Sequence, residues 1–406
     1  MRARRRDAPR SLRQLRSALR RRGVSQDAIE RATDDDTLPL LAVERLAMPE
    51  RPTLDAADLA VRSDLDEEQL VRFWRALGFP DPVPDDRIYT EADLQMALAV
   101  GHLLRSGLIE PDLSLQMTRV IGSTMARLAS AQVDAIEASM ADRGHDDRAG
   151  EDDPVTPAAT AGLALQLMPA VMTYAWRRHL QDAARRRLVR VAGDEDERRA
   201  VVGFADLVGF TALSQQVSDH ELAAVLERFE ALAYDLVAEG GGRVVKMIGD
   251  EVMFTTDDVD AGLEIALRLA ERLREADDIP DVRVGLAEGE LLTREGDLYG
   301  AVVNLAHRIV AIAYPGAVVV SDDVRRAAGD DEEHRWQPLR THVLKDIGRV
   351  KLWMVQREGD PDAGGLLERT RGHRLAVWQR VADLFAGEGA AAGDPTGPDP
   401  PPEGER

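Results

Sequence analysis

Residues 201–211 read VVGFADLVGFT, and this stretch decides the fold of the C-terminal half of the chain. The apolar, partly β-branched run predicts a buried strand, and Gly209, Phe210 and Thr211 at its end indicate the start of a helix. Asp206 is the one acid inside this strand. A single Asp in such a place is more often a cap, a turn residue or a solvent-facing group than a functional one. Its role therefore depends on what the rest of the chain places beside it.

A second acid downstream changes the interpretation of Asp206. Residues 243–254 read RVVKMIGDEVMF, in which two short apolar runs flank a turn that contains Gly249, and this pattern predicts a β-hairpin. If the hairpin tip meets the end of the first strand, Asp250 lies beside Asp206. Two hard carboxylates are what a pair of divalent ions on a nucleotide triphosphate needs. The sequence therefore predicts a site for two Mg²⁺ or Mn²⁺ ions at Asp206 and Asp250.

Strand and helix signals alternate through the rest of this half. After the strand that ends at Asp206, the pattern predicts a helix over 219–238, a hairpin over 243–255, a helix over 259–275, a strand over 282–287, a loop to Gly300, a helix to about Ala313, a strand over 317–320 and further strand material to Gln356. This order is βαββαβ with additions. It predicts an α+β sandwich of the ferredoxin-like type.

Four segments stand in the order and spacing of a known catalytic domain: FADLVGFT, KMIGDE, GDLYG and VNLAHR. On these motifs the C-terminal half, from about residue 198 to 357, resembles the class III nucleotide cyclase catalytic domain. The N-terminal half is similar to the helical regulatory domain of the autoinhibited, pH-responsive actinobacterial adenylate cyclases. The resemblance implies an adenylate cyclase, in which the ribose 3′-oxygen of ATP attacks the α-phosphorus and releases cyclic AMP and pyrophosphate.

The resemblance also assigns roles to individual residues. It implies that the backbone carbonyl of Leu207 is a further metal ligand and that Lys345 binds phosphate. By the family pattern, Asn304 orients the ribose and Arg308 stabilises charge that develops on the phosphorus oxygens. Asn304 and Arg308 are four apart and so share one helix face, whereas His307 is expected to be a bystander. Backbone N–H groups at Phe210 and Thr211, at a helix start, can bind the phosphates.

Lys246 and Asp297 are expected to read the adenine edge. By the family pattern the Lys donates to a ring nitrogen and the Asp accepts from the exocyclic amine. Guanine presents the opposite polarity at both atoms, so this pair favours ATP over GTP. Lys246 and Asp250 are four residues apart along a strand, or about 13 Å, which is too far to serve one small site. A two-fold homodimer with shared sites resolves this distance.

Two other classes of function remain open from the sequence. A diguanylate cyclase shares the fold, but this chain has IGDEV in place of a GGDEF-type signature. A non-catalytic nucleotide-sensing or DNA-binding regulator with a cyclase-like module is the alternative from a different class. Complete metal, base and transition-state positions count against such a sensor.

Composition restricts the number of domains, the cellular environment and the partners that can be expected for the protein. The chain has 406 residues, of which 44% are hydrophobic, so it can bury a core and form two or three domains. It has no cysteine, which excludes disulfides and thiolate metal sites and suits a reducing cytoplasm. No apolar run is long enough to span a bilayer. The net charge of −21 disfavours nucleic acid as a partner. We therefore expect a soluble cytoplasmic protein.

The N-terminal half reads as a basic arm followed by helices in series. Arginines crowd residues 1–22, where Leu12, Leu15 and Leu19 fall on one helical face that could contact acidic lipid, nucleic acid or the acidic body of the protein; a solvated arm is the alternative. The expected N-caps are Ser25, Thr53, Thr90 and Ser114. The expected domains are the arm 1–22, an all-α regulatory domain 23–176, a linker or switch 177–199, the cyclase domain 200–357, and a C-terminal helix with a disordered tail, 358–406.

Residues 54–79 have the pattern of a helix-turn-helix, which raises DNA binding as an alternative. The second helix, however, would begin with Asp66, Glu67 and Glu68, and these acids repel phosphates. A packed regulatory module is the favoured interpretation. Within the switch, His179 is a candidate proton sensor, because imidazole changes charge near neutral pH. Protonation, a lipid or a partner protein could each act on this segment.

Overall fold

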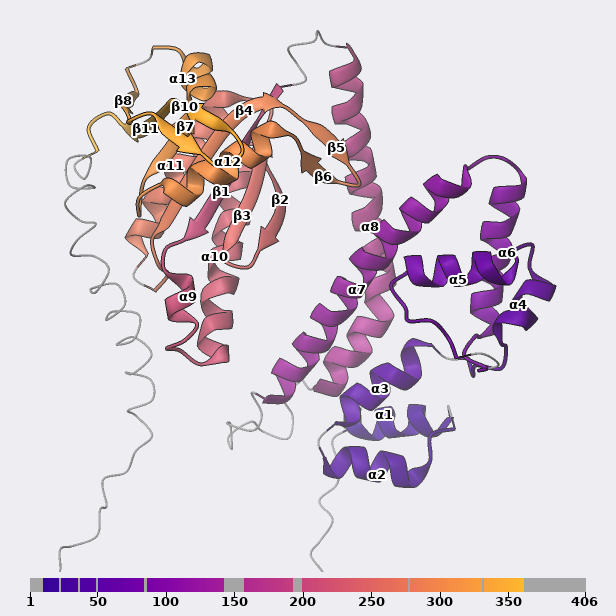
Figure 1. The fold of residues 1–406 in the computed structure, drawn as a ribbon. Coiled ribbons are helices and arrows are strands. Elements are labelled where there is room, and N and C mark those ends of the chain that lie inside the picture. Colours follow the sequence, from indigo (N-terminus) through magenta and orange to yellow (C-terminus); the bar gives the residue numbers. More distant parts are fainter. Residues whose placement is uncertain are drawn as a thin grey trace, which may run out of the picture. The chain divides into compact units, whose positions relative to one another are not determined.

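The computed structural model describes residues 10–360, except for residues 22, 36, 49, 84–85, 142–156, 193–198, 277 and 331. The chain divides into two compact units, Met1–Arg185 and Arg186–Arg406. The first is helical and the second contains the sheet (Figure 1). The predicted domain boundaries stay predictions, and the predicted C-terminal helix and tail lie outside the described residues.

The basic N-terminal segment is part of the helical unit. Helices α1 (Arg10–Arg21), α2 (Gln26–Asp34) and α3 (Leu38–Ala47) share a small apolar core. Leu15 and Leu19 of α1 are buried in it. The apolar face of α1 packs within its own unit, which contradicts the alternative of a solvated arm.

Helices α4 (Ala56–Arg62), α5 (Glu67–Ala76) and α6 (Glu91–Arg105) form a second core around Leu59, Leu70 and Leu94. Asp66 caps α5 by accepting a hydrogen bond from the N–H of Gln69, and the side-chain oxygen of Gln69 accepts one from the N–H of Asp66. The acids at this terminus therefore stabilise the helix start. They support the packed-module interpretation of the predicted helix-turn-helix.

Two long helices complete the first part of the chain. Helix α7 (Pro111–Ala141) packs closely on α5, because a Cβ at Gly122 would lie 2.4 Å from the carbonyl oxygen of Leu77. Helix α8 (Pro157–Ala192) is continuous through residues 177–192, which are most of the predicted switch. Among the described residues no helix is long and apolar enough to cross a membrane.

In the described part of the second unit, the strands of the main sheet follow the order β2-β3-β1-β4-β7-β11-β8, antiparallel except for the parallel pair β4 and β7. This sheet confirms the predicted α+β class. Its strands are β1 (Arg199–Leu207), β2 (Arg243–Ile248), β3 (Glu251–Thr256), β4 (Val282–Glu290), β7 (Val318–Ser321), β8 (His334–Pro338) and β11 (Leu352–Arg357).

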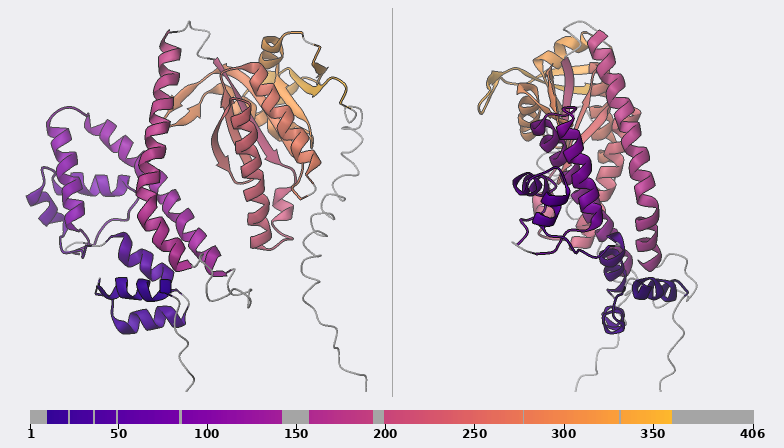
Figure 2. Two further views of the ribbon diagram at one scale, coloured as in Figure 1. Left: turned by 180° about the vertical axis from the view of Figure 1, so that it is seen from behind. Right: turned by 90° about the vertical axis from the view of Figure 1, so that its right-hand side faces the viewer.

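Helices cover both faces of the sheet. Alternate residues of β1 divide between two cores, with Val201 and Ala205 in one and Val202 and Phe204 in the other. Helices α10 (Asp219–Glu239), α11 (Val259–Glu275) and α13 (Asp322–Ala328) line the first core, and α12 (Ala301–Ile312) lines the second. Helix α12 lies in front of the sheet in Figure 1, and α10 and α11 lie in front of it in the view from behind in Figure 2.

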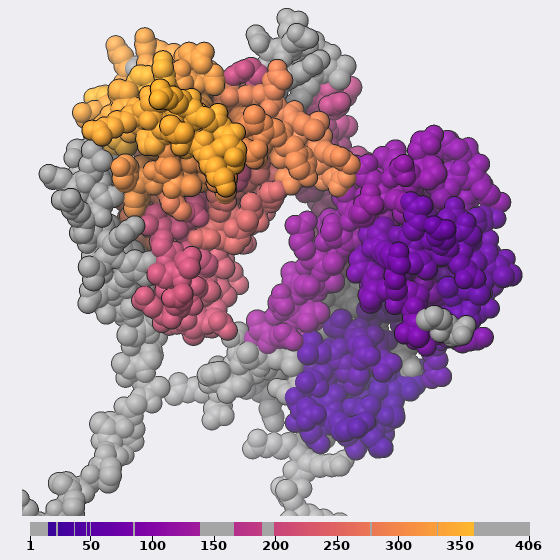
Figure 3. All heavy atoms as spheres, viewed as in Figure 1, coloured from indigo at the N-terminus to yellow at the C-terminus, as the bar shows by residue number. Residues whose placement is uncertain are grey.

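Short elements occupy the predicted loop to Gly300 and the predicted strand material up to Gln356, which also contains helix α13. The predicted loop to Gly300 contains a hairpin of β5 (Leu292–Arg294) and β6 (Asp297–Tyr299), which projects from its unit (Figure 3). Another hairpin pairs β9 (His342–Leu344) with β10 (Gly348–Val350). A loop was the wrong prediction because three-residue strands carry too little alternating pattern.

Candidate active site

A row of three charged side chains crosses the sheet at the end of β1. Asp206 is paired with Glu251 of β3 on one side and with Arg283 of β4 on the other. Residues directly opposite each other in antiparallel strands point to the same face. The next pair on the same face is Phe204 with Met253, and both residues belong to the core under α12. The charged row, Glu251, Asp206 and Arg283, therefore lies on the α12 face of the sheet.

Arg283 holds the carboxylate of Asp206. Its Nε and Nη2 lie 2.6 and 2.5 Å from Oδ2 of Asp206. Its Nη1 also donates to the carbonyl oxygen of Ala311 on α12, at 3.3 Å. The side chain of Asp206 is only 14% exposed, so this fork is a partly buried and charge-assisted contact. It fixes the direction in which Asp206 points.

Asp250 reaches the same place from the hairpin tip. Gly249 takes a positive φ of 63° in the turn between β2 and β3, a conformation that favours glycine. The backbone N–H of Leu207 donates to the carbonyl oxygen of Asp250 at 3.1 Å, which ties the hairpin tip to the end of β1. The structure thus brings together the neighbourhoods of the predicted metal residues Asp206, Leu207 and Asp250.

The electrostatics of this corner are those of crowded acids. Burial raises the pKa of Asp250, and the neighbouring Asp206 raises it further. Burial, with Asp206 and Asp250 in support, raises the pKa of Glu251 to about 7. Like charges in a half-buried place disfavour full ionisation, and a bound dication relieves them. The corner is therefore suited to a cation.

The donor set at this corner fits divalent ions that are shared with a substrate. No group of three or more His, Cys, Asp or Glu within the described ranges is placed to hold a metal by itself. Mg²⁺ is commonly bound through one or two carboxylates, with substrate phosphates and water as its other ligands. Asp206 and Asp250 supply two such hard oxygen donors.

Lys246 and Asp297 meet although they are 51 residues apart. The Nζ of Lys246 lies 2.5 Å from Oδ2 of Asp297, which is the first residue of β6. A β-bulge between Val244 and Lys246 allows this contact. Val244 packs in the core under α10 and α11, and without the bulge Lys246 would point to that same side. The bulge turns Lys246 to the face where Asp297 lies.

The pair is electrostatically coupled. Partial burial opposes ionisation of Asp297, but the Lys246 ammonium and the backbone N–H of Leu298 hold its pKa below the ordinary value. Among the described side chains, no hydrogen bond or ion pair joins Lys246 or Asp297 to Asp206 or Asp250. The base residues and the metal residues therefore form two separate groups within one chain.

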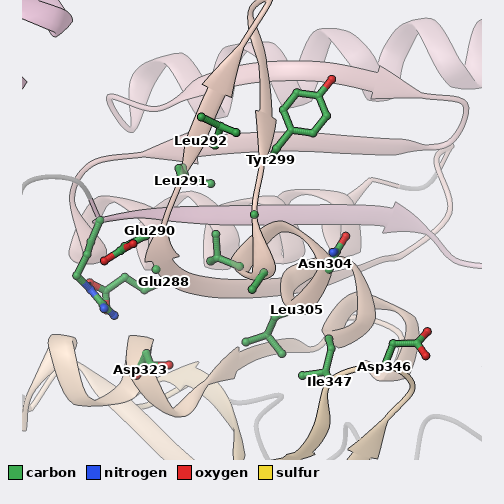
Figure 4. A pocket seen from close by; sticks show the side chains of 15 residues that line it. Glu288, Glu290, Leu291, Leu292, Tyr299, Asn304, Leu305, Asp323, Asp346 and Ile347 are labelled. Atoms are coloured by element: carbon green, nitrogen blue, oxygen red, sulfur yellow. The ribbon is translucent and has the colours of Figure 1, made fainter.

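Helix α12 carries the predicted catalytic residues. It begins after Gly300 and packs against β4 so closely that a Cβ at Gly285 would lie 2.4 Å from the backbone nitrogen of Val310. Asn304 is exposed and Arg308 is half-buried. Asn304 lines a cavity of about 800 Å³, with Asp346 on its side and Glu288 and Glu290 on the other (Figure 4).

The remaining predicted substrate residues lie at two places. Lys345 is exposed in the turn of the β9–β10 hairpin, directly before the cavity residues Asp346 and Ile347. Phe210 and Thr211 begin α9 (Phe210–Leu213), after Gly209 with a φ of 78°. As the first residues of a helix, their N–H groups have no acceptor within it. Their role as phosphate donors stays a prediction.

His179 is exposed on α8. Its predicted regulatory role therefore stays a prediction.

Sequence reasoning missed Arg283 and Glu251. The signal for Arg283 was that it is the one cation within the apolar run 282–287. A charged side chain inside a buried strand is expected to have a partner of opposite charge. Glu251 was hidden next to Asp250, and its burial, at 8% exposure, follows only from the register. His307, expected to be a bystander, contacts Glu251 and Phe204.

Comparison with known proteins identifies both halves of the chain. Residues 6–179 match the family described as adenylate cyclase regulatory domain, and residues 194–357 match the adenylate and guanylate cyclase catalytic domain. An adenylate cyclase of Streptomyces coelicolor is 35% identical over 331 residues, which cover 72% of this chain and 82% of the relative. The chain belongs to the class III adenylate cyclase family.

Two other relatives of this cyclase share both halves. An adenylate cyclase of Streptomyces griseus is 36% identical over 76% of this chain and 77% of its own length. A pH-sensitive adenylate cyclase of Mycobacterium tuberculosis is 32% identical over 82% of this chain and 85% of its own length. Each match extends beyond the catalytic half, so the helical unit of the cyclase belongs to the same arrangement.

Proposed function

We propose that the cyclase converts ATP to 3′,5′-cyclic AMP and pyrophosphate. The ribose 3′-oxygen attacks the α-phosphorus, the bond to the β-phosphate oxygen breaks, and the 3′-hydroxyl proton is lost. The observation that carries this proposal is the Lys246–Asp297 pair, a donor and an acceptor on the face that also bears Asp206. The reaction needs positioning and charge neutralisation more than covalent chemistry from the protein.

The Lys246–Asp297 pair matches adenine group for group. In the free chain Lys246 donates to Asp297. Adenine offers an acceptor nitrogen to Lys246 and an amine donor to Asp297. Lys246 therefore still has an acceptor, and Asp297 still has a donor, when the base is bound. Guanine offers the reverse at both atoms and would leave both residues unsatisfied, which costs far more than a missing contact. The proposed substrate is therefore ATP.

Asp206 and Asp250, with the carbonyl of Leu207, would hold two Mg²⁺ or Mn²⁺ ions. Such ions supply Lewis-acid polarisation of the attacking oxygen and neutralise triphosphate charge. Arg283 holds Asp206 in place and adds a guanidinium beside the triphosphate. Phe210 and Thr211 offer backbone N–H groups, and Lys345 a further charge. Asn304 orients the ribose, and Arg308 faces the charge developing at the α-phosphorus.

A homodimer with shared sites accommodates this division of labour. Each chain would give Asp206 and Asp250 to one site and Lys246, Asp297, Asn304 and Arg308 to the other. Support comes from the two separate groups within the chain and from the distance of about 13 Å between the backbones of Lys246 and Asp250.

The direct test is production of cyclic nucleotide by the full chain with Mn²⁺ and either ATP or GTP. We expect cyclic AMP from ATP and at least about 100-fold less product from GTP, the discrimination that a hydrogen-bonding site achieves. Equal use of both nucleotides would contradict the assignment of Lys246 and Asp297 to adenine recognition. The absence of any product would favour a nucleotide-sensing module instead.

The helical unit is proposed to restrain the catalytic unit, with activity rising at mildly acidic pH. This is supported by the regulatory-domain match and by the pH-sensitive relative. Imidazole titrates in this range, and His179 lies on the helix that leads to β1. We expect His179→Gln to flatten the activity profile between about pH 5.5 and 8, and His102→Gln to leave it unchanged. Identical profiles for all three proteins would remove His179 from the proposal.

The setting of the cyclase follows from the same reasoning. A cytoplasmic location without nucleic-acid partners stays a prediction from charge and cysteine content. Contact of the basic helix α1 with a lipid or membrane surface stays a prediction as well, and its buried Leu15 and Leu19 count against deep insertion.

A further inference from the structure

His307 lies where the catalytic helix meets the charged row. Its Nε2 is 3.8 Å from Oε2 of Glu251, and its ring packs edge-on against Phe204, with ring centroids 5.4 Å apart. Phe204 is buried, whereas His307 is about half exposed. The contact therefore joins α12, on top of the sheet, to the first residue of β3 beneath it.

Glu251 is a largely buried carboxylate in the charged row. Its side chain is 11% exposed, and it stands beside Asp206 in the charged row. The guanidinium of Arg283 donates hydrogen bonds to the carboxylate of Asp206 and to the carbonyl oxygen of Ala311. Within the described part of the chain, His307 contacts the Glu251 carboxylate at 3.8 Å, and this contact is an ion pair when the imidazole is protonated. A buried carboxylate gains substantially from such a partner.

The contact bears directly on Arg308. His307 and Arg308 are consecutive on one rigid helical turn, and Asn304 lies one turn before them. Helix α12 is held to the charged row at two points, by His307 at Glu251 and by the Ala311 carbonyl at Arg283. Two points of attachment fix both the rotation and the slide of a helix. Errors of about 1 Å in a catalytic group can cost about 100-fold in rate.

We propose that His307 is a positioning residue: its contact with Glu251 ties α12 to the hairpin that carries Asp250 and so fixes where Arg308 projects. The inference rests on the proposed function, because Arg308 acts there on the developing charge. In the shared-site dimer, Asp250 and Arg308 of one chain serve different sites. The contact therefore transmits position from the metal residues of one site to the transition-state residue of the other.

Single variants of the full chain separate positioning from packing. His307→Ala and His307→Phe are expected to lower kcat about tenfold while KM for ATP changes less than about twofold, since the interaction acts in the transition state. His307→Gln, which retains a donor, recovers most of kcat. His220→Ala, an exposed histidine on α10, is the matched control and behaves as the parent. Full activity of His307→Phe would show that the ring only packs, and would overturn the proposal.

Two readouts are independent of turnover. The Mn²⁺ affinity of His307→Ala is expected to equal that of the parent, and a loss of affinity would assign His307 to the metal site instead. The imidazole proton resonances of His307 should shift in Glu251→Gln, and unchanged resonances would show that the contact is absent in solution. If the parent makes no cyclic AMP, the proposed function fails, whereas these resonances still test the contact.

Heterodimers locate the effect. A dimer of Asp206→Ala and Arg308→Ala chains has one intact site, which takes Arg308 from the Asp206→Ala chain. Adding His307→Ala to that chain is expected to lower the recovered activity about tenfold, whereas adding it to the Arg308→Ala chain leaves the activity unchanged. The reverse result would place the action of His307 on the metal residues of its own chain and overturn the proposal. Glu251→Gln combined with His307→Ala should be no worse than His307→Ala alone, because both remove one contact.

Discussion

Asp206 and Arg283 face each other across an unbroken strand ladder, whereas Lys246 reaches Asp297 only because a bulge interrupts its strand. The proposed metal half of the site joins Asp206, which lies in regular register between β3 and β4, to Asp250 at the tip of the β2–β3 hairpin. The base half, Lys246 and Asp297, depends on that bulge and on a short hairpin outside the main sheet. The proposed metal residue Asp206 thus lies in regular structure, and the residues proposed to select the base lie in irregular structure.

This difference has a physical consequence. A ladder residue is held on both sides, so a change there alters the charge of the row without moving it. Lys246 and Asp297 contact each other outside this ladder, so their donor and acceptor groups can be exchanged while the ladder stays intact. Changes in the metal half should therefore remove activity with any nucleotide, and changes in the base half should redirect it.

The largest effect is expected from Asp206→Ala. Removing this carboxylate should lower cyclic AMP formation about 1,000-fold, because it removes a proposed metal ligand and the ion-pair partner of Arg283. Asp260→Ala, an exposed acid in the first turn of α11, is the control. Steady-state rates with saturating Mn²⁺ make the measurement. More than about a tenth of parental activity in Asp206→Ala would contradict the proposed metal half.

A smaller effect is expected when the base half is reversed. Lys246→Glu with Asp297→Cys should lower kcat/KM for ATP about 100-fold and raise that for GTP, since the polarity then matches guanine. Mn²⁺ affinity should not change. Lys351→Glu, an exposed charge reversal, is the control. An equal loss with both nucleotides would mean that the pair supports the fold rather than the choice of base.

The smallest effect concerns stability in the absence of metal. The pKa of Glu251 is raised from 4.5 to about 7 in the fold. The folded protein therefore binds this proton more tightly than the unfolded chain does, and the associated stability falls as pH rises from about 4.5 to 7. Between pH 5 and 7 the parent should lose about 2 kcal/mol relative to Glu251→Gln. Urea unfolding in EDTA at both pH values measures this difference, and parallel behaviour of the two proteins would contradict it.

The sequence predicted the strand and the hairpin that carry Asp206 and Asp250, because their signals are local. The apolar run that ends at Asp206 and the turn at Gly249 both read as regular elements, and the helix predicted over 259–275 agrees with α11. Ser25 and Thr90 are N-caps as predicted. Thr53 and Ser114 were wrong, because Asp55 caps α4 and α7 begins at Pro111.

What the sequence could not predict depends on contacts between distant strands. Alternation along β2 gives no sign of the bulge, because Val244, Val245 and Lys246 read as an ordinary strand. The meeting of Lys246 with Asp297 came from the family resemblance and not from the pattern. Likewise, the burial of Glu251 and its contact with His307 follow from register and helix placement, which no local signal contains.

The central claim is that each site draws its metal residues from one chain and its base and transition-state residues from the other. Asp206→Ala and Arg308→Ala chains, carrying different tags, can be co-expressed and their heterodimers purified. Each variant alone should be inactive, and the heterodimer should recover about half of the parental activity, because one of its two sites is intact. Heterodimers as inactive as either variant alone would contradict the shared site.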